Sequence, residues 1–147
     1  MSLISRNALV PYSAEEMYKL VEDVESYPDF LPWCRSTEVL SREGDEVKAS
    51  IEIAKGGLNK SFTTTNFMQK NKMIEMRLLK GPFKHLQGFW RFDALKDEKA
   101  CKISFDLDFE FESKLIALAA SSVFNQIANT MVDAFSKRAI EVYGERI

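Results

Sequence analysis

Apolar residues between Lys114 and Gly144 recur at steps of three and four, which predicts one long helix. Its apolar stripe consists of Ile116, Ala120, Val123, Phe124, Ile127, Met131, Ala134, Phe135 and Val142. No proline interrupts the pattern. At about 1.5 Å per residue the helix would be roughly 45 Å long, so a large apolar surface must cover its stripe.

Upstream, apolar and polar residues alternate with a period of two, which predicts β-strands. The clearest strand spans 101–111, where Cys101, Ile103, Phe105, Leu107, Phe109 and Phe111 share one face. The same period predicts strands over 3–10, 37–41, 47–53, 58–68, 73–79 and 86–92, separated by short turns. Gly88 falls inside one of these strands, where a glycine indicates a bulge or a close approach to the backbone.

Two short helical segments are predicted after the first strand. Ser13 is followed three residues later by Glu16, the pattern of a capping box that begins a helix. Pro28 and Pro32 then forbid a regular helix, although Tyr27–Trp33 is too apolar to lie in water. We therefore expect a bent second helical segment that packs against the protein.

This order of elements predicts an α+β fold in a single domain over residues 1–147. Strands that follow one another through short turns form an antiparallel meander. We expect a curved sheet of about seven strands wrapped around the long C-terminal helix, with the two short helices after the first strand.

The composition of the chain predicts an apolar interior with few chemically reactive side chains. The chain has 46% hydrophobic and 29% charged residues, and its 11 Phe outnumber 4 Tyr and 2 Trp. Two cysteines without a CxxC pair and one histidine give no metal-ligand set, so we expect no metal and no cofactor. Residues 1–11 lack the apolar run of a signal peptide. We expect a cytoplasmic protein, with transient contact at the inner membrane as an open alternative.

Positive charge is concentrated in one part of the sequence. The net charge is −2, yet residues 55–84 contain seven Lys or Arg and a single acid, Glu75. Two interpretations remain open: solvated strand edges and turns, or a contact surface for anionic lipid or RNA phosphate.

No assembled catalytic site is evident, so we expect a protein that is not an enzyme. His85 is the single imidazole, and it lies on the strand face opposite Trp90. Cys34 lacks a base beside it, and we expect a buried, inert thiol. Asp106, Asp108 and Glu110 share the face opposite the phenylalanines, which indicates solvated charges.

Three stretches resemble the coenzyme Q-binding branch of the START-like, polyketide cyclase and lipid-transport superfamily. They are Asp23–Cys34 (DVESYPDFLPWC), Gly81–Phe92 (GPFKHLQGFWRF) and Phe124–Ala139 (FxxxAxxMxxAFxxRA). The resemblance covers nearly the whole chain and implies a helix-grip fold, in which a curved sheet and a C-terminal helix enclose a hydrophobic cavity.

The resemblance implies two functions of different classes. The first is non-enzymatic binding of ubiquinone or another isoprenoid lipid, in support of respiratory electron transport. The alternative, from the ribosome association toxin branch, is binding to the large ribosomal subunit that blocks subunit association. No motif indicates DNA binding.

For the first function we predict a lining of apolar residues. The sheet side would contribute Trp90, Phe92, Phe105 and Phe109, and the helix side Phe124, Ile127, Met131 and Phe135. Trp33 and the loop that carries Phe83 would frame the mouth, with Phe83 at the membrane surface. Small residues in the first half of the helix favour a cavity there: Ala117, Ala119, Ala120, Ser121 and Ser122. An ordinary filled core is the competing interpretation.

Overall fold

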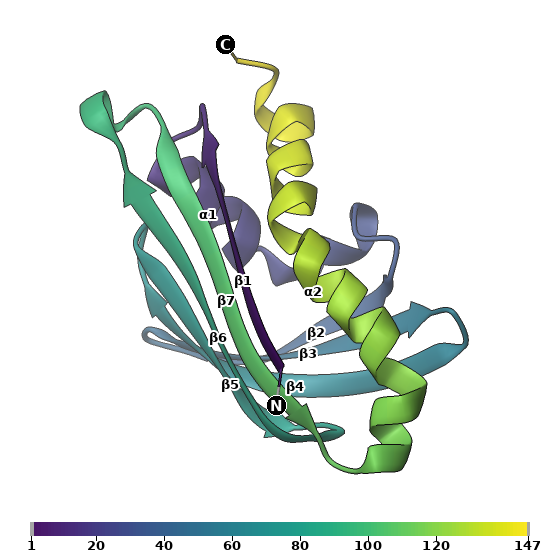
Figure 1. The fold of residues 1–147 in the computed structure, drawn as a ribbon. Coiled ribbons are helices and arrows are strands. Elements are labelled where there is room, and N and C mark those ends of the chain that lie inside the picture. The colour runs from purple at the N-terminus through teal and green to yellow at the C-terminus, as the bar shows by residue number, and fades with distance from the viewer. Residues whose placement is uncertain (1, 147) are drawn as a thin grey trace.

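A curved antiparallel sheet wraps around one long helix (Figure 1). This computed structural model describes residues 2–146, with the backbone alone for Ser2 and Lys96. The strands are β1 (Ser2–Val10), β2 (Cys34–Glu43), β3 (Glu46–Lys55), β4 (Leu58–Gln69), β5 (Met73–Lys80), β6 (Phe83–Ala94) and β7 (Cys101–Phe111). The helices are α1 (Ala14–Glu22), η1 (Val24–Asp29), η2 (Lys96–Glu98) and α2 (Lys114–Tyr143). The predicted seven-stranded α+β fold is confirmed.

The strands β2 to β7 form a meander, and β1 returns to pair with β7. The sheet order is therefore β1-β7-β6-β5-β4-β3-β2, with β1 and β2 at its two edges. The chain crosses from one edge to the other through α1 and η1. Both segments pack on the concave side, where Tyr18 of α1 stacks on Phe92 of β6.

Local chemistry explains where the short helices begin and bend. Ser13 caps α1: the Glu16 backbone N–H donates to Ser13 Oγ at 3.1 Å, and the Ser13 N–H donates to Glu16 Oε1 at 2.9 Å. In η1, Pro28 stands inside a 3₁₀ turn and Tyr27 is buried, as is Leu31 just after the turn. The predicted capping box and the predicted bent, packed segment are both confirmed.

Helix α2 lies across the concave side of the sheet (Figure 1). Its buried residues are Ala120, Phe124, Ile127, Ala128, Val132, Phe135 and Ala139. The predicted stripe placed Val142 in the core, but Val142 is half exposed and Ala139 is buried instead. The buried face shifts because α2 packs against β7, β1 and α1 in turn.

The end of α2 is fastened to α1 by a cluster that we call the C-terminal clasp: Tyr12, Glu16, Tyr143 and Arg146. Arg146 donates to both carboxylate oxygens of Glu16, at 2.7 and 2.9 Å, and lies 4.9 Å from the centre of the Tyr12 ring. The Tyr143 hydroxyl donates to the Glu16 carbonyl oxygen at 2.9 Å. These contacts hold the two helices together.

The clasp should give the protein a defined acid sensitivity. Hydrogen bonding from Arg146 lowers the pKa of Glu16 from 4.5 to about 2. Because the folded protein favours the ionised carboxylate, this stabilisation is complete above pH 4.5 and disappears as the pH falls towards 2. We expect Arg146→Met to lower the urea midpoint at pH 7, and the difference from wild type to shrink below pH 4.5. Lys19→Met, which removes an exposed pair with Glu15, should leave the midpoint nearly unchanged; an Arg146→Met effect that is constant with pH would contradict the assignment.

Candidate functional site

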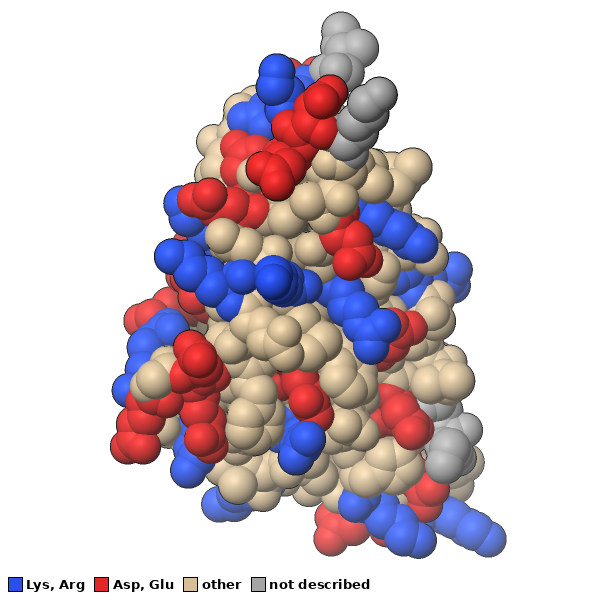
Figure 2. Space-filling model, turned by 90° about the vertical axis from the view of Figure 1, so that its left-hand side faces the viewer, with Lys and Arg blue, Asp and Glu red and all other residues tan. Residues whose placement is uncertain are grey.

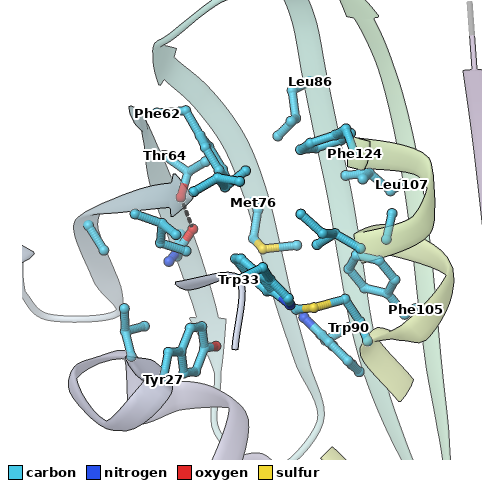
Figure 3. Close-up of a pocket in the computed structure, with 18 residues that line it drawn as sticks. Tyr27, Trp33, Phe62, Thr64, Met76, Leu86, Trp90, Phe105, Leu107 and Phe124 are labelled. Carbon is cyan, nitrogen blue, oxygen red and sulfur yellow. Dashed lines mark hydrogen bonds between the residues drawn. The ribbon is translucent and has the colours of Figure 1, made fainter. Parts of the chain in front are cut away.

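A cavity of about 80 Å³ lies between the concave face of the sheet and the middle of α2 (Figure 3). Its wall is almost entirely apolar and comes from η1 and the segment after it, from β3 to β7 and from α2. The lining residues are Val24, Tyr27, Trp33, Ala49, Ile51, Ile53, Phe62, Thr64, Asn66, Met76, Leu86, Trp90, Phe105, Leu107, Phe124, Ile127, Ala128 and Met131.

The cavity exists because α2 leaves one half of the sheet loosely covered. The helix packs on β7 and β1, and its contacts with β2, β3 and β4 are sparse. Two small, buried side chains line this gap, Ala49 on β3 and Ala128 on α2. Ile51 on β3 and Met131 on α2 also line it and are half-buried, so the cover between these two elements is thin.

Six of the predicted site residues line this cavity: Trp33, Trp90, Phe105, Phe124, Ile127 and Met131. Trp90 and Phe105 form one wall, with ring centres 4.6 Å apart. Figure 3 shows Trp33, from the segment before β2, and Trp90, from β6, beside the same space. Their role in ligand binding stays a prediction.

Three other predicted residues are buried in the packing around the cavity rather than in its wall. Phe92 packs on Tyr18 of α1. Phe135 packs against Tyr27, Phe30 and Trp90. Phe109 contacts Phe124 from the other side, with ring centres 4.8 Å apart.

Phe83 does not lie at a membrane surface, and that prediction is wrong. A register shift between Phe83 and His85 turns the Phe83 side chain inward. Its ring is 6% exposed and packs against Phe111 at 5.2 Å and Phe124 at 5.1 Å between ring centres.

The predicted cavity beside α2 lies further along the helix than the small residues that suggested it. Two of those residues, Ala117 and Ser121, instead line a groove on the surface. Ala120 covers a filled cluster of rings that consists of Phe62, Phe83, Phe109, Phe111 and Phe124. The open space lies one to two turns further along α2, at Phe124–Met131.

Sequence reasoning missed the two polar residues of the lining, Thr64 and Asn66. Both are buried on the concave face of β4, in phase with Phe62. The Thr64 hydroxyl donates to Asn66 Oδ1 at 2.8 Å (Figure 3). The available signal was the strand alternation itself, which assigns positions 62, 64 and 66 to the same face.

Gly88 makes room for the cavity wall, as predicted from its place within a strand. A Cβ at this position would lie 2.8 Å from Met76 Cε and 3.0 Å from Leu107 Cδ1. The register is regular there, so the glycine serves a close approach and not a bulge.

Because Met76 and Leu107 both line the cavity, we expect Gly88→Ala to push them into it. Apolar ligands should then bind about tenfold more weakly, and stability should fall by about 1–2 kcal/mol. Calorimetric titration and urea unfolding measure the two effects. Gly57→Ala makes the same chemical change at a turn with open space around it. This control should leave ligand affinity unchanged, whatever its effect on stability. Unaltered affinity in Gly88→Ala would contradict the account.

The cavity wall offers no acid–base pair. Among its lining residues there is no carboxylate, imidazole, amine or thiol. The Tyr27 hydroxyl donates to the Val21 carbonyl oxygen, and burial raises the pKa of Tyr27. Burial also raises the pKa of the Cys34 and Cys101 thiols to about 11, which keeps them protonated and unreactive. No cluster suited to a metal ion occurs among the described residues.

The remaining polar groups from the sequence lie outside the cavity. His85 Nε2 is 3.1 Å from Asp108 Oδ1 on the outer face of the sheet, where the alternation placed both residues. Asp106 accepts a hydrogen bond from Ser5 there.

The basic stretch 55–84 does not form one continuous patch. Lys55 and Lys60 flank the β3–β4 turn, whereas Lys70 and Lys72 lie in the β4–β5 turn, roughly 30 Å away along β4. Arg77 is paired with Glu75 and Lys84 with Glu110. On the face that Figure 2 shows, Lys and Arg are interspersed with Asp and Glu.

Helix α2 is long and apolar enough, by length and composition, to be a candidate membrane span. In this structure its buried residues pack against the sheet and α1 as the core helix of the fold. Its exposed apolar residues include Leu115 and Leu118 in the first turns.

Comparison with known proteins gives consistent relatives. Residues 10–136 match the family model described as polyketide cyclase / dehydrase and lipid transport. The ribosome association toxin RatA of Escherichia coli K12 is 51% identical over 146 residues, covering 99% of this chain and 92% of that protein. The mitochondrial coenzyme Q-binding protein COQ10 homolog B of Xenopus laevis is 30% identical over 145 residues, covering 97% of this chain and 59% of that protein.

Solved structures share the fold at low sequence identity. The aromatase/cyclase Zhui from a Streptomyces species superposes with a TM-score of 0.82, covering 99% of both chains at 16% identity. At that identity the likeness concerns the fold alone.

Proposed function

Since this chain belongs to the polyketide cyclase / dehydrase and lipid transport family, we propose that it binds a hydrophobic ligand of the ubiquinone class in the cavity under α2. The observation that carries the proposal is the cavity wall, which is apolar except for Thr64 and Asn66. Such a wall suits an apolar molecule with a small polar head. The relative named as a coenzyme Q-binding protein supports the choice of ligand, and a role in respiratory electron transport would follow from it.

The size of the cavity limits what it holds at rest. Sites for drug-sized ligands are typically about 300–1,000 Å³, and this cavity is about 80 Å³. A quinone ring or one end of a chain is therefore the part that enters first, and a longer tail requires α2 to move away from β3. Each buried isoprenoid unit would remove roughly 100 Å² of apolar surface from water, worth about 2.5 kcal/mol before the costs of binding.

We propose binding without catalysis. Ring-closing and dehydrating chemistry needs a positioned acid or base within reach of the substrate. The polar groups of the lining described above are hydroxyl, amide and indole N–H groups only, and the hydroxyls of Tyr27 and Thr64 already donate to protein acceptors. The fold shared with an aromatase/cyclase does not add such a group.

One end of the molecule is suited to approach a membrane, where ubiquinone resides. Leu115 and Leu118 at the start of α2 are 78% and 85% exposed. Lys114, next to Leu115, borders a groove that Lys84, Glu110 and Glu112 also line, and a lysine beside exposed leucines favours anionic lipid headgroups. These leucines, not Phe83, are the apolar residues that we propose to touch the bilayer during ligand pick-up.

The ligand is tested by extraction of the purified protein with organic solvent followed by mass spectrometry. We expect ubiquinone or another isoprenoid lipid in the extract, and uptake of ubiquinone from vesicles that contain anionic lipid. A protein that yields no lipid and takes none up from vesicles would contradict the proposal.

A second candidate function is association with the large ribosomal subunit. The observation that favours it is the 51% identity with a protein named ribosome association toxin. We propose that Lys55 and Lys60 at one end of β4, and Lys70 and Lys72 at the other, make separate contacts with RNA phosphates. The cavity and these lysines occupy different parts of the molecule, so the two functions are compatible.

Sucrose-gradient sedimentation of a lysate that contains the tagged protein tests the ribosome proposal. We expect the protein in large-subunit fractions at low salt and its release as salt is raised, because phosphate contacts are salt-dependent. Absence from those fractions at low salt would contradict it.

A further inference from the structure

Two polar side chains stand in the wall of an otherwise apolar cavity. Thr64 and Asn66 occupy successive inward positions of β4, a central strand between β3 and β5. They are 5% and 7% exposed, so both are more than nine-tenths buried. Polar side chains buried this deeply are costly unless their hydrogen bonds are made.

The hydrogen bond between them leaves one donor group over. Thr64 donates its hydroxyl proton to Asn66 Oδ1 at 2.8 Å. This bond fixes the orientation of the Asn66 amide, so that Nδ2 points away from Thr64. Within residues 2–146 the structure shows no acceptor for that Nδ2. No side-chain nitrogen or oxygen in the described part is both fully enclosed and without a partner, so Nδ2 keeps access to the space of the cavity.

The surroundings of this donor favour a flat ring. Trp33, Trp90 and Met76 face the same space as Thr64 (Figure 3). Aromatic and thioether groups pack well against a planar ring, and apart from the indole N–H of each tryptophan they carry no strong hydrogen-bonding group.

We infer that Thr64 and Asn66 are the anchor that selects the head of the ligand, with Asn66 Nδ2 donating to a carbonyl-type oxygen on a planar ring. This inference rests on the proposed function and adds the chemistry of recognition: a ligand needs an acceptor oxygen, not only apolar surface. Thr64 is a positioning residue, because it acts by holding the Asn66 amide in place.

A matched pair of probes separates the hydrogen bond from apolar burial. Duroquinone and durene have the same tetramethyl ring, but only duroquinone carries carbonyl oxygens. The chain has two tryptophans, Trp33 and Trp90, and both line the cavity. Titration of ¹⁵N-labelled protein therefore reports occupancy through two indole N–H signals.

We expect wild type to bind duroquinone about tenfold more tightly than durene. Asn66→Leu should weaken duroquinone binding about tenfold and leave durene binding unchanged, since one hydrogen bond is lost. Thr64→Val should reproduce part of that loss, and Thr64→Ser should restore wild-type affinity. The serine variant keeps the hydroxyl, so it decides the question even if Asn66→Leu fails to fold.

Equal affinity of wild type for the two probes would overturn the inference and leave the proposed function standing. Equal weakening of both probes in Asn66→Leu, or failure of Thr64→Ser to restore what Thr64→Val loses, would also overturn it, because packing alone would then explain the residues. If wild type binds neither probe, the proposed function fails and the inference fails with it.

Discussion

Replacing Phe135 with alanine is expected to lower the free energy of unfolding by about 3–5 kcal/mol. Phe135 is 0% exposed and lies where α2, η1 and β6 meet. Its ring is edge-on to Tyr27, Phe30 and Trp90, with ring centres 5.2–5.4 Å apart. Its removal leaves a cavity and breaks three aromatic contacts at once.

Urea unfolding followed by circular dichroism measures this loss. Phe89→Ala is the matched control, because Phe89 lies on the outer face, half-buried beside Arg91, and should cost about 1 kcal/mol. A Phe135→Ala variant no less stable than Phe89→Ala would show that the three-element junction is not a main source of stability.

Replacing Ala128 with phenylalanine is expected to abolish ligand binding, with a loss of at least about a hundredfold. Ala128 is buried on α2 with its methyl group in the cavity wall. A benzyl group there would occupy the space that we assign to the ligand head. Because it grows into an existing void, the cost in stability should stay near 1–2 kcal/mol, within the range for overpacking.

Binding of duroquinone, measured by the indole signals, and urea unfolding together check this result. Ala119→Phe makes the same chemical change at an exposed position of the same helix and should leave binding unaltered. Wild-type affinity in Ala128→Phe would mean that ligands bind elsewhere. Ribosome sedimentation of the two variants should be equal if the cavity and the ribosome contacts are separate.

The fold could be predicted because its elements have strong periodicities. In β7 every second residue from Cys101 to Phe109 is buried, and the Ser13–Glu16 capping box marks the start of α1 within one residue. Each of these signals is local, so the sequence alone carries it.

The site was predicted only in part because its geometry depends on how the elements pack. The register shift before His85 inverts the side of β6 on which Phe83 points, and no feature of the sequence marks it. The position of the cavity follows from the uneven contact of α2 with the two halves of the sheet. Thr64 and Asn66 were overlooked because a polar residue in a strand normally faces solvent, although their alternation with Phe62 assigns them to the buried face.

Because α2 covers β2–β4 only loosely, its movement should also set the rates at which ligands bind and leave. A ligand larger than the resting cavity can enter only after α2 and β3 separate, so the observed rate of association should level off at the rate of that opening as ligand concentration rises. The C-terminal clasp holds the far end of α2 to α1 during such an excursion. Release must pass through the same opening, so the rate of opening also sets an upper limit on the rate of dissociation.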